Sequence, residues 1–99
     1  MKEESGIHVC PITKVAELLS DTWTMLIMRA LTEGPKRFCE LEAWLGKIST
    51  RTLTLKLQKL TTEGLVEKLP DGYYKATQKG AGLKIIERAM VKYGEQYLD

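Results

Sequence analysis

Several residue types on which enzymes and metal sites depend are scarce in this sequence of 99 residues. It has a single histidine, His8, and two cysteines, Cys10 and Cys39. One histidine without neighbouring ligands predicts no metal site, and two cysteines are too few for a disulfide framework. No carboxylate pair, Ser/His/Asp set or phosphate-cradling glycine loop is recognisable either. The sequence therefore predicts a protein that is not an enzyme and uses no metal or cofactor.

Long apolar runs are missing as well. No stretch approaches the roughly 18 apolar residues that a membrane-spanning helix needs. The first six residues are polar and acidic, unlike a signal peptide. We therefore expect a cytoplasmic protein. A chain of this length is expected to form one domain over residues 1–99, with a modest core.

Charge is low overall but unevenly distributed. The net charge is only +2, which alone does not indicate nucleic-acid binding. Between Lys47 and Lys79, however, seven basic and three acidic side chains give +4, and the rest of the chain carries −2. A locally basic middle is typical of a nucleic-acid footprint on one face. The alternative is a solvated lysine face.

Apolar periodicity predicts two helices in the first third of the chain. The first should run from Pro11 to about Ser20, with proline at its first position. Asp21 is a good N-cap for the second. The core-facing stripe of the second helix consists of Trp23, Leu26, Ile27, Ala30 and Leu31. Met25 and Met28 lie off that stripe, so this helix is either central in the domain or covered by a partner chain.

The next segment predicts a helix-turn-helix. A very short strand over 36–38 precedes a helix from about Cys39 to Leu45, and Gly46 ends that helix. Ser49 then caps a longer helix that runs to about Glu63. The inward-facing residues of these two helices are Leu41, Trp44 and Leu45, then Leu53, Leu57 and Leu60.

A β-hairpin and a last helix are expected to follow. Strands over 65–69 and 73–76 are joined by the turn at 70–72. Thr77 can cap a helix that runs from Gln78 to the end. Together these elements predict a fold that is mainly α with a small β-hairpin wing, a winged helix-turn-helix.

Apolar residues on the last helix recur with heptad spacing, which predicts a contact between two copies of the chain. The alternative is a stripe that docks on the protomer itself. The residues of this heptad seam are Leu83, Ile86, Met90, Tyr93 and Tyr97. Met25 and Met28, off the stripe of the second helix, are predicted to join them in a dimer interface.

The helix after Ser49 has a broad face outside its apolar stripe. Arginine, amide and hydroxyl side chains are the types that read base edges in a major groove, and the N-terminal part of a recognition helix enters that groove. The residues predicted to face bases are Thr50, Arg51, Thr54, Gln58 and Leu55. Leu55 either meets a thymine methyl group or is a stray exposed leucine.

Donors around this face are expected to contact phosphates, which position a protein on the duplex. They are Lys36, Arg37, Lys47, Ser49 and Lys59, together with Lys68 and Lys75 beside the hairpin turn. The alternative for each lysine is simple solubility.

The order of short motifs resembles the HxlR-type winged helix-turn-helix regulators, relatives of the MarR group. The motifs are Cys10-Pro11, Trp23-Thr24, Gly34-Pro35-Lys36-Arg37-Phe38, Glu40-Leu41, Ile48-Ser49, Arg51-Thr52-Leu53, Gly64-Leu65-Val66 and Thr77-Gln78-Lys79-Gly80. The resemblance implies a prokaryotic transcriptional regulator that acts as a homodimer through its first and last helices, which adds Ile12 and Val15 of the first helix to the expected dimer interface. Two-fold symmetry then implies a pseudo-palindromic operator in double-stranded DNA.

The resemblance also implies a role for a cysteine, because some relatives sense electrophiles or oxidants through the cysteine before the first helix. Cys10 occupies that place. Cys39 is a second candidate, since the start of a helix and the nearby Arg37 favour a thiolate. The alternatives are a small residue at the dimer edge and an inert, half-buried thiol. A small-molecule effector between the helices is a further possibility.

The hairpin departs from the family pattern, since residues 70–77 form a shorter wing than relatives usually have. DNA binding is therefore expected to depend more on the recognition helix. A different class of function also stays open at this point, because one fold hosts several functions. That alternative is a winged helix used for protein–protein assembly, without a specific DNA site.

Overall fold

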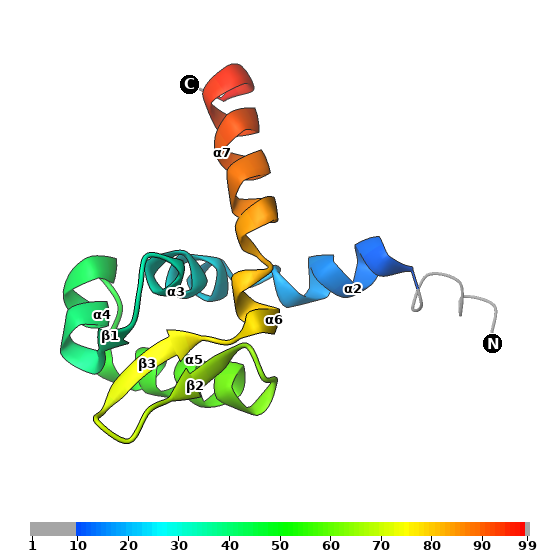
Figure 1. Ribbon diagram of the computed structural model, residues 1–99. Coiled ribbons are helices and arrows are strands. Elements are labelled where there is room, and N and C mark those ends of the chain that lie inside the picture. The colour runs from blue at the N-terminus through cyan, green and yellow to red at the C-terminus, as the bar shows by residue number, and fades with distance from the viewer. Residues whose placement is uncertain (1–9, 99) are drawn as a thin grey trace.

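The computed structural model describes residues 10–98, so His8 lies outside the described part of the chain. Two helices, α2 and α7, extend away from a body that the other elements form (Figure 1). The elements are α2 (Pro11–Leu18), α3 (Thr22–Thr32), β1 (Lys36–Arg37), α4 (Phe38–Leu45), α5 (Thr50–Thr62), β2 (Val66–Lys68), β3 (Tyr73–Ala76), α6 (Gln78–Ala81) and α7 (Lys84–Tyr97).

Helix α3 lies at the centre of the core. Asp21 caps it as predicted, because its Oδ1 accepts a hydrogen bond from the Trp23 backbone N–H at 2.9 Å. Ile27, Met28, Ala30 and Leu31 of this helix are buried. The sequence left open whether α3 is central or covered by a partner, and the structure shows that it is central. Met28 has no exposed surface, so its assignment to a dimer interface is wrong: the side chain belongs to the protomer's own core.

The helix-turn-helix consists of α4 and α5, joined by a turn at Gly46. Gly46 has a φ of 81°, a left-handed conformation that glycine adopts without the steric cost of a Cβ. Leu41 on α4 is buried as predicted, whereas Trp44 keeps 39% of its surface exposed. The inward assignment of Trp44 is therefore wrong, because α4 is short and packs along one narrow line.

A three-stranded antiparallel sheet in the order β1-β3-β2 closes one side of the body. The wing is its β2–β3 hairpin, in which Val66 pairs with Ala76 and Lys68 with Tyr74. Arg37 on β1 pairs with Tyr73 on the other side of β3. The two strands of the wing have three and four residues.

The C-terminal segment is two helices, not one. Thr77 caps α6 through a hydrogen bond from the Gly80 N–H to its Oγ1 at 3.1 Å, but the chain then turns at Gly82 and Leu83 before α7 begins. Leu83 keeps a helical backbone conformation, but its N–H donates to the Gly80 carbonyl, three residues back, at 3.0 Å. Its side chain packs into the core with 6% exposure. The prediction of one continuous helix, and of Leu83 as a dimer residue, is therefore wrong.

Among residues 10–98, no helix has the length and apolar character that crossing a membrane would require.

Candidate nucleic-acid interface

The start of α5 is fixed by its cap. The Ser49 Oγ accepts a hydrogen bond from the Thr52 N–H at 3.0 Å and donates one to the Thr52 hydroxyl at 2.9 Å. Leu53, Leu57 and Leu60 are buried beneath the helix. Because the buried line is narrow, the opposite side of α5 is left free toward solvent.

That free side carries the residues predicted to face bases. Thr50, Arg51, Thr54, Leu55 and Gln58 are all exposed. Leu55 keeps 52% of its surface accessible although it is a large apolar residue. The structure therefore brings the predicted base-facing set together on one helix face.

The two threonines of this set already use their hydroxyl hydrogens. The Thr50 hydroxyl donates to Glu42 Oε2 on α4 at 2.7 Å, and the Thr54 hydroxyl donates to the Thr50 carbonyl at 2.8 Å. Each hydroxyl can still accept a hydrogen bond. Arg51 and Gln58 make no side-chain hydrogen bond or ion pair within residues 10–98, so they are the donors available on this face.

A groove of about 620 Å³ separates α5 from the wing. Its helix side includes Thr54, Gln58 and Thr61, and its wing side is formed by Lys68 and Tyr74. The Lys68 ammonium lies 5.7 Å from the centre of the Tyr74 ring, a distance at which a cation is attracted to the ring face. The groove thus has hydroxyl and amide groups on one side and a cation on the other.

Arg37 is held on the wing. Its guanidinium carbon lies 4.5 Å from the centre of the Tyr73 ring. The neighbouring Tyr73 side chain raises the pKa of Arg37 above its ordinary value. The turn residues Pro70, Asp71 and Gly72 include no cation. The positive charge nearest to Tyr73 is therefore supplied by β1.

The structure does not bring all predicted phosphate contacts together. Lys36 is only 17% exposed and its ammonium lies 3.7 Å from Glu33. Lys59 lines a different hollow, beside α2. Lys75 is on the outer face of β3, directly opposite Glu67 of β2. Of the remaining candidates, the Ser49 hydroxyl is already used in capping α5. Lys47 is exposed next to the start of α5.

Two residues of the interface were missed in the sequence. Tyr74 lines the groove, and Glu42 holds Thr50. The alternation of strand residues is a signal that could have placed Tyr74 on the same face as its partner Lys68. Glu42 offered no such signal, because its contact joins two helices across a turn.

A family model described as HxlR-like helix-turn-helix matches residues 18–99. The chain belongs to this family. It is a helix-turn-helix transcriptional regulator that binds DNA. The HxlR-like description agrees with the resemblance read from the sequence motifs.

Several relatives are similar over most of their length. An HTH-type transcriptional regulator of Synechocystis sp. is 35% identical, over 97% of this chain and 75% of its own. The regulator YodB of Bacillus subtilis is 32% identical, over 95% of this chain and 90% of its own. The crystal structure of quinone-bound YodB superposes with a TM-score of 0.82, covering 89% of this chain and all of the other. The reduced form of the redox regulator HypR is 26% identical, with a TM-score of 0.78, over 91% of this chain and 95% of the other.

The cysteines of this HxlR-like chain lie at two helix starts. Cys10 is half-buried at the N-cap of α2. The pKa of the Cys10 thiol is lowered below its ordinary value, because the backbone N–H groups of Thr13 and Ile12 in the first turn of α2 favour the thiolate. Cys39 is exposed in the first turn of α4.

Helices α2 and α7 carry large apolar side chains that residues 10–98 leave uncovered. Of the predicted dimer residues, Ile86 packs against the protomer's own core, and Met25 is half-buried. The exposed ones are Ile12, Val15, Met90, Tyr93 and Tyr97. Ile85, Val91 and Leu98 are exposed as well, although they were not predicted. The rings of Tyr93 and Tyr97 are 4.9 Å apart.

Proposed function

We propose that this HxlR-like regulator binds a pseudo-palindromic operator in double-stranded DNA as a homodimer, with α5 of each protomer in a major groove. The observation that supports this most directly is the free face of α5, on which Arg51 and Gln58 keep their donors unused. Arginine pairs with guanine and glutamine with adenine in that groove. Two-fold symmetry requires half-sites about one helical turn apart, or a multiple of it.

The remaining contacts follow from the same placement. Leu55 meets a thymine methyl group, and Thr50 and Thr54 accept hydrogen bonds or touch a methyl group. A sugar–phosphate strand lies in the groove between α5 and the wing, where Lys68 faces it. Lys47 and Arg37 contact phosphates at the two ends of the surface. We also propose that the protein acts in the cytoplasm and has a binding role rather than a catalytic one.

Salt dependence tests the DNA contact directly. Each phosphate neutralised contributes a slope of about −0.9 in a plot of log affinity against log salt. With Arg37, Lys47 and Lys68 from two protomers, we expect a slope of about −5. The measurement is fluorescence anisotropy with DNA from upstream of the gene, with unrelated DNA of equal length as the control. Equal and salt-labile binding to both DNAs, or no binding, would contradict a specific site upstream of the gene.

The exposed apolar faces of α2 and α7 support the homodimer, since uncovered patches of this kind mark association surfaces. Changing Met90 to Lys places a charge in that patch and is expected to shift the protein from dimer to monomer in sedimentation velocity. Glu95→Lys, an exposed polar position on the same helix, should stay dimeric. A wild-type protein that sediments as a monomer would refute the proposal.

Thiol chemistry at Cys10 is the proposed route of modulation, supported by its lowered pKa and its place at the start of α2. The redox description of HypR and the quinone-bound state of YodB are consistent with it. Because a lowered pKa leaves more thiolate at a given pH, Cys10 should alkylate faster near neutral pH than a model thiol. The rate is measured by mass spectrometry on Cys39→Ser protein, with Cys10→Ser protein reporting Cys39 alone. A rate for Cys10 no greater than that of the model thiol would rule out this role.

A further inference from the structure

The Asp21 carboxylate contacts two helices at once. Its Oδ1 caps α3 through the Trp23 N–H, and its Oδ2 forms an ion pair with the Lys56 ammonium on α5. The Oδ2 atom is itself shielded from water. The Lys56 ammonium lowers the pKa of the Asp21 carboxyl below its ordinary value, so this carboxyl stays ionised at neutral pH. The start of α3 and the middle of α5 are therefore joined through one side chain.

Lys56 lies beside the buried line of α5 and not on its free face. It follows Leu53 by three positions and precedes Leu60 by four, and residues at these spacings share one side of a helix. Its side chain keeps only 29% of its surface exposed, whereas Arg51 on the free face is exposed. The Lys56 ammonium is therefore directed to Asp21 and not to a duplex that lies against the free face.

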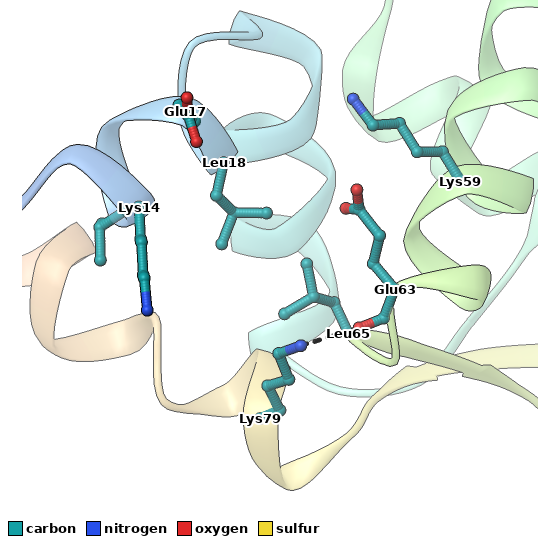
Figure 2. A pocket seen from close by; sticks show the side chains of 8 residues that line it. Lys14, Glu17, Leu18, Lys59, Glu63, Leu65 and Lys79 are labelled. Carbon is teal, nitrogen blue, oxygen red and sulfur yellow. Dashed lines mark hydrogen bonds between the residues drawn. The ribbon is translucent and has the colours of Figure 1, made fainter. Parts of the chain in front are cut away.

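A hollow separates α2 from the C-terminal part of α5. Its volume is about 570 Å³, and Figure 2 shows Leu18 of α2 on one side of it and Lys59 and Glu63 of α5 on the other. No residue of α2 is buried. Asp21 lies in the short junction between α2, which ends at Leu18, and α3, which begins at Thr22. The ion pair thus reaches from α5 to the point where α2 joins the body.

The position of α5 relative to this junction affects the geometry of a dimer. Helix α2 carries Ile12 and Val15 of the exposed apolar face, so the dimer proposed above holds α2. The two copies of α5 then have to meet major grooves a fixed distance apart along the duplex. A shift of α5 against the α2–α3 junction changes that separation. A constraint on α5 at this junction therefore contributes to the match with the operator.

We propose that Asp21 and Lys56 are positioning residues for operator recognition. Their ion pair fixes α5 relative to the α2–α3 junction, and in the dimer it sets the separation of the two recognition helices. Loss of either partner leaves the other charge half-buried and unpaired, which is unfavourable and is relieved when the helix shifts. The inference rests on the proposed function, because it requires both the dimer and the operator.

Asp21→Asn distinguishes positioning from a simple effect of charge. Asparagine caps a helix as well as aspartate does, so the variant keeps the cap of α3 and loses only the charge. Removing an acid strengthens DNA binding through charge alone, whereas loss of positioning weakens it. In anisotropy we expect binding to the upstream DNA to weaken about tenfold, the effect of about one mismatched base pair, with binding to unrelated DNA no weaker than in the wild type. An operator affinity equal to or above that of the wild type would overturn the proposal.

Variants of Lys56 test the other partner. Lys56→Met should weaken operator binding as Asp21→Asn does, and the double variant should lose no more, because two partners in one interaction are not additive. Lys56→Arg restores the cation and should bind nearly as the wild type does. Lys59→Met is the control, since it removes the same charge from α5 and Lys59 has no ion pair within 4 Å among residues 10–98. Equal losses for Lys56→Met and Lys59→Met on both DNAs would show that Lys56 acts only through its charge.

A change in the spacing of the operator gives a readout that a loss of stability does not alter. The second operator has one base pair added between its half-sites, and all proteins are compared below the melting temperature of the least stable one. Wild type should discriminate against the longer operator, and Asp21→Asn and Lys56→Met should lose most of that discrimination. Full discrimination in both variants would refute a role in setting the separation of the recognition helices.

Hydrogen exchange without DNA distinguishes failure of this proposal from failure of the proposed function. The backbone amides of α5 should exchange about threefold faster in Asp21→Asn and in Lys56→Met, as for the loss of a weak ion pair, and those of α7 should be unchanged. Unaltered exchange in α5 would overturn the positioning role, whatever the DNA results. Faster exchange in α5, together with no specific DNA binding by the wild type, would overturn the proposed operator and leave Asp21 as the residue that holds α5.

Discussion

Replacing Arg51 with alanine is expected to weaken binding to the cognate operator by about 1–3 kcal/mol, which corresponds to roughly 5- to 150-fold in affinity. Arg51 is exposed on the free face of α5 and has no partner among residues 10–98. Its guanidinium is therefore available for a bidentate contact to guanine. The same substitution should relax the sequence preference at one base position in each half-site.

The measurement is anisotropy with the operator and with single-base variants of it. Arg29→Ala serves as the control, because Arg29 is an exposed arginine on α3, outside the helix-turn-helix. It removes the same charge and should leave the base preference unchanged. If Arg51→Ala and Arg29→Ala lose affinity equally and without a change in preference, Arg51 does not read a base.

Replacing Gly80 with alanine is expected to lower the free energy of unfolding by about 3 kcal/mol, the upper end of the usual range for overpacking. A Cβ at this position would collide with the Leu65 backbone carbonyl and lie 2.7 Å from the Met28 methyl group. The methionine side chain can move, but the carbonyl cannot, because it accepts a hydrogen bond from the Thr77 N–H at 3.0 Å.

Gly82→Ala is the matched control, two residues further along the chain. Its Cβ would meet the nearest atom, the Lys79 carbonyl oxygen, at 3.4 Å, an ordinary van der Waals distance. We expect a change within about 0.5 kcal/mol, as for most surface substitutions. Urea unfolding of all three proteins at one protein concentration gives the comparison. A Gly80→Ala protein as stable as Gly82→Ala would show that this close approach relaxes without cost.

Local signals in the sequence were sufficient for most of the fold. Asp21, Ser49 and Thr77 each cap the helix they were expected to cap, because capping depends only on a side chain and the next few backbone N–H groups. The strand from Tyr73 to Ala76 was likewise predicted with its observed bounds. Such features need no knowledge of the rest of the chain.

The predictions that were wrong concern features that depend on tertiary packing. The break between α6 and α7 lies at Gly82 and Leu83. Leu83 enters the core there, and a heptad pattern alone does not show whether a leucine faces the protomer's own core or a second copy. Met28 was misplaced because α3 is surrounded on nearly all sides, so a single-stripe helical wheel does not apply to it. For the candidate interface, residue type predicted which side chains carry positive charge but not where those side chains point. In the structure, Lys36, Lys59 and Lys75 lie on three separate surfaces.

Arg37 stacks on Tyr73 from a neighbouring strand. The reach of the hairpin and the positive charge beside Tyr73 can therefore change independently. Arg37 belongs to β1, outside the β2–β3 hairpin, so the length of the turn can vary without moving or deleting this positive charge. Insertions and deletions at residues 70–72 are therefore a route by which relatives can alter the reach of the hairpin while keeping the same charged contact. Substitution at Arg37 has the opposite effect, since it removes the charge and leaves the reach unchanged.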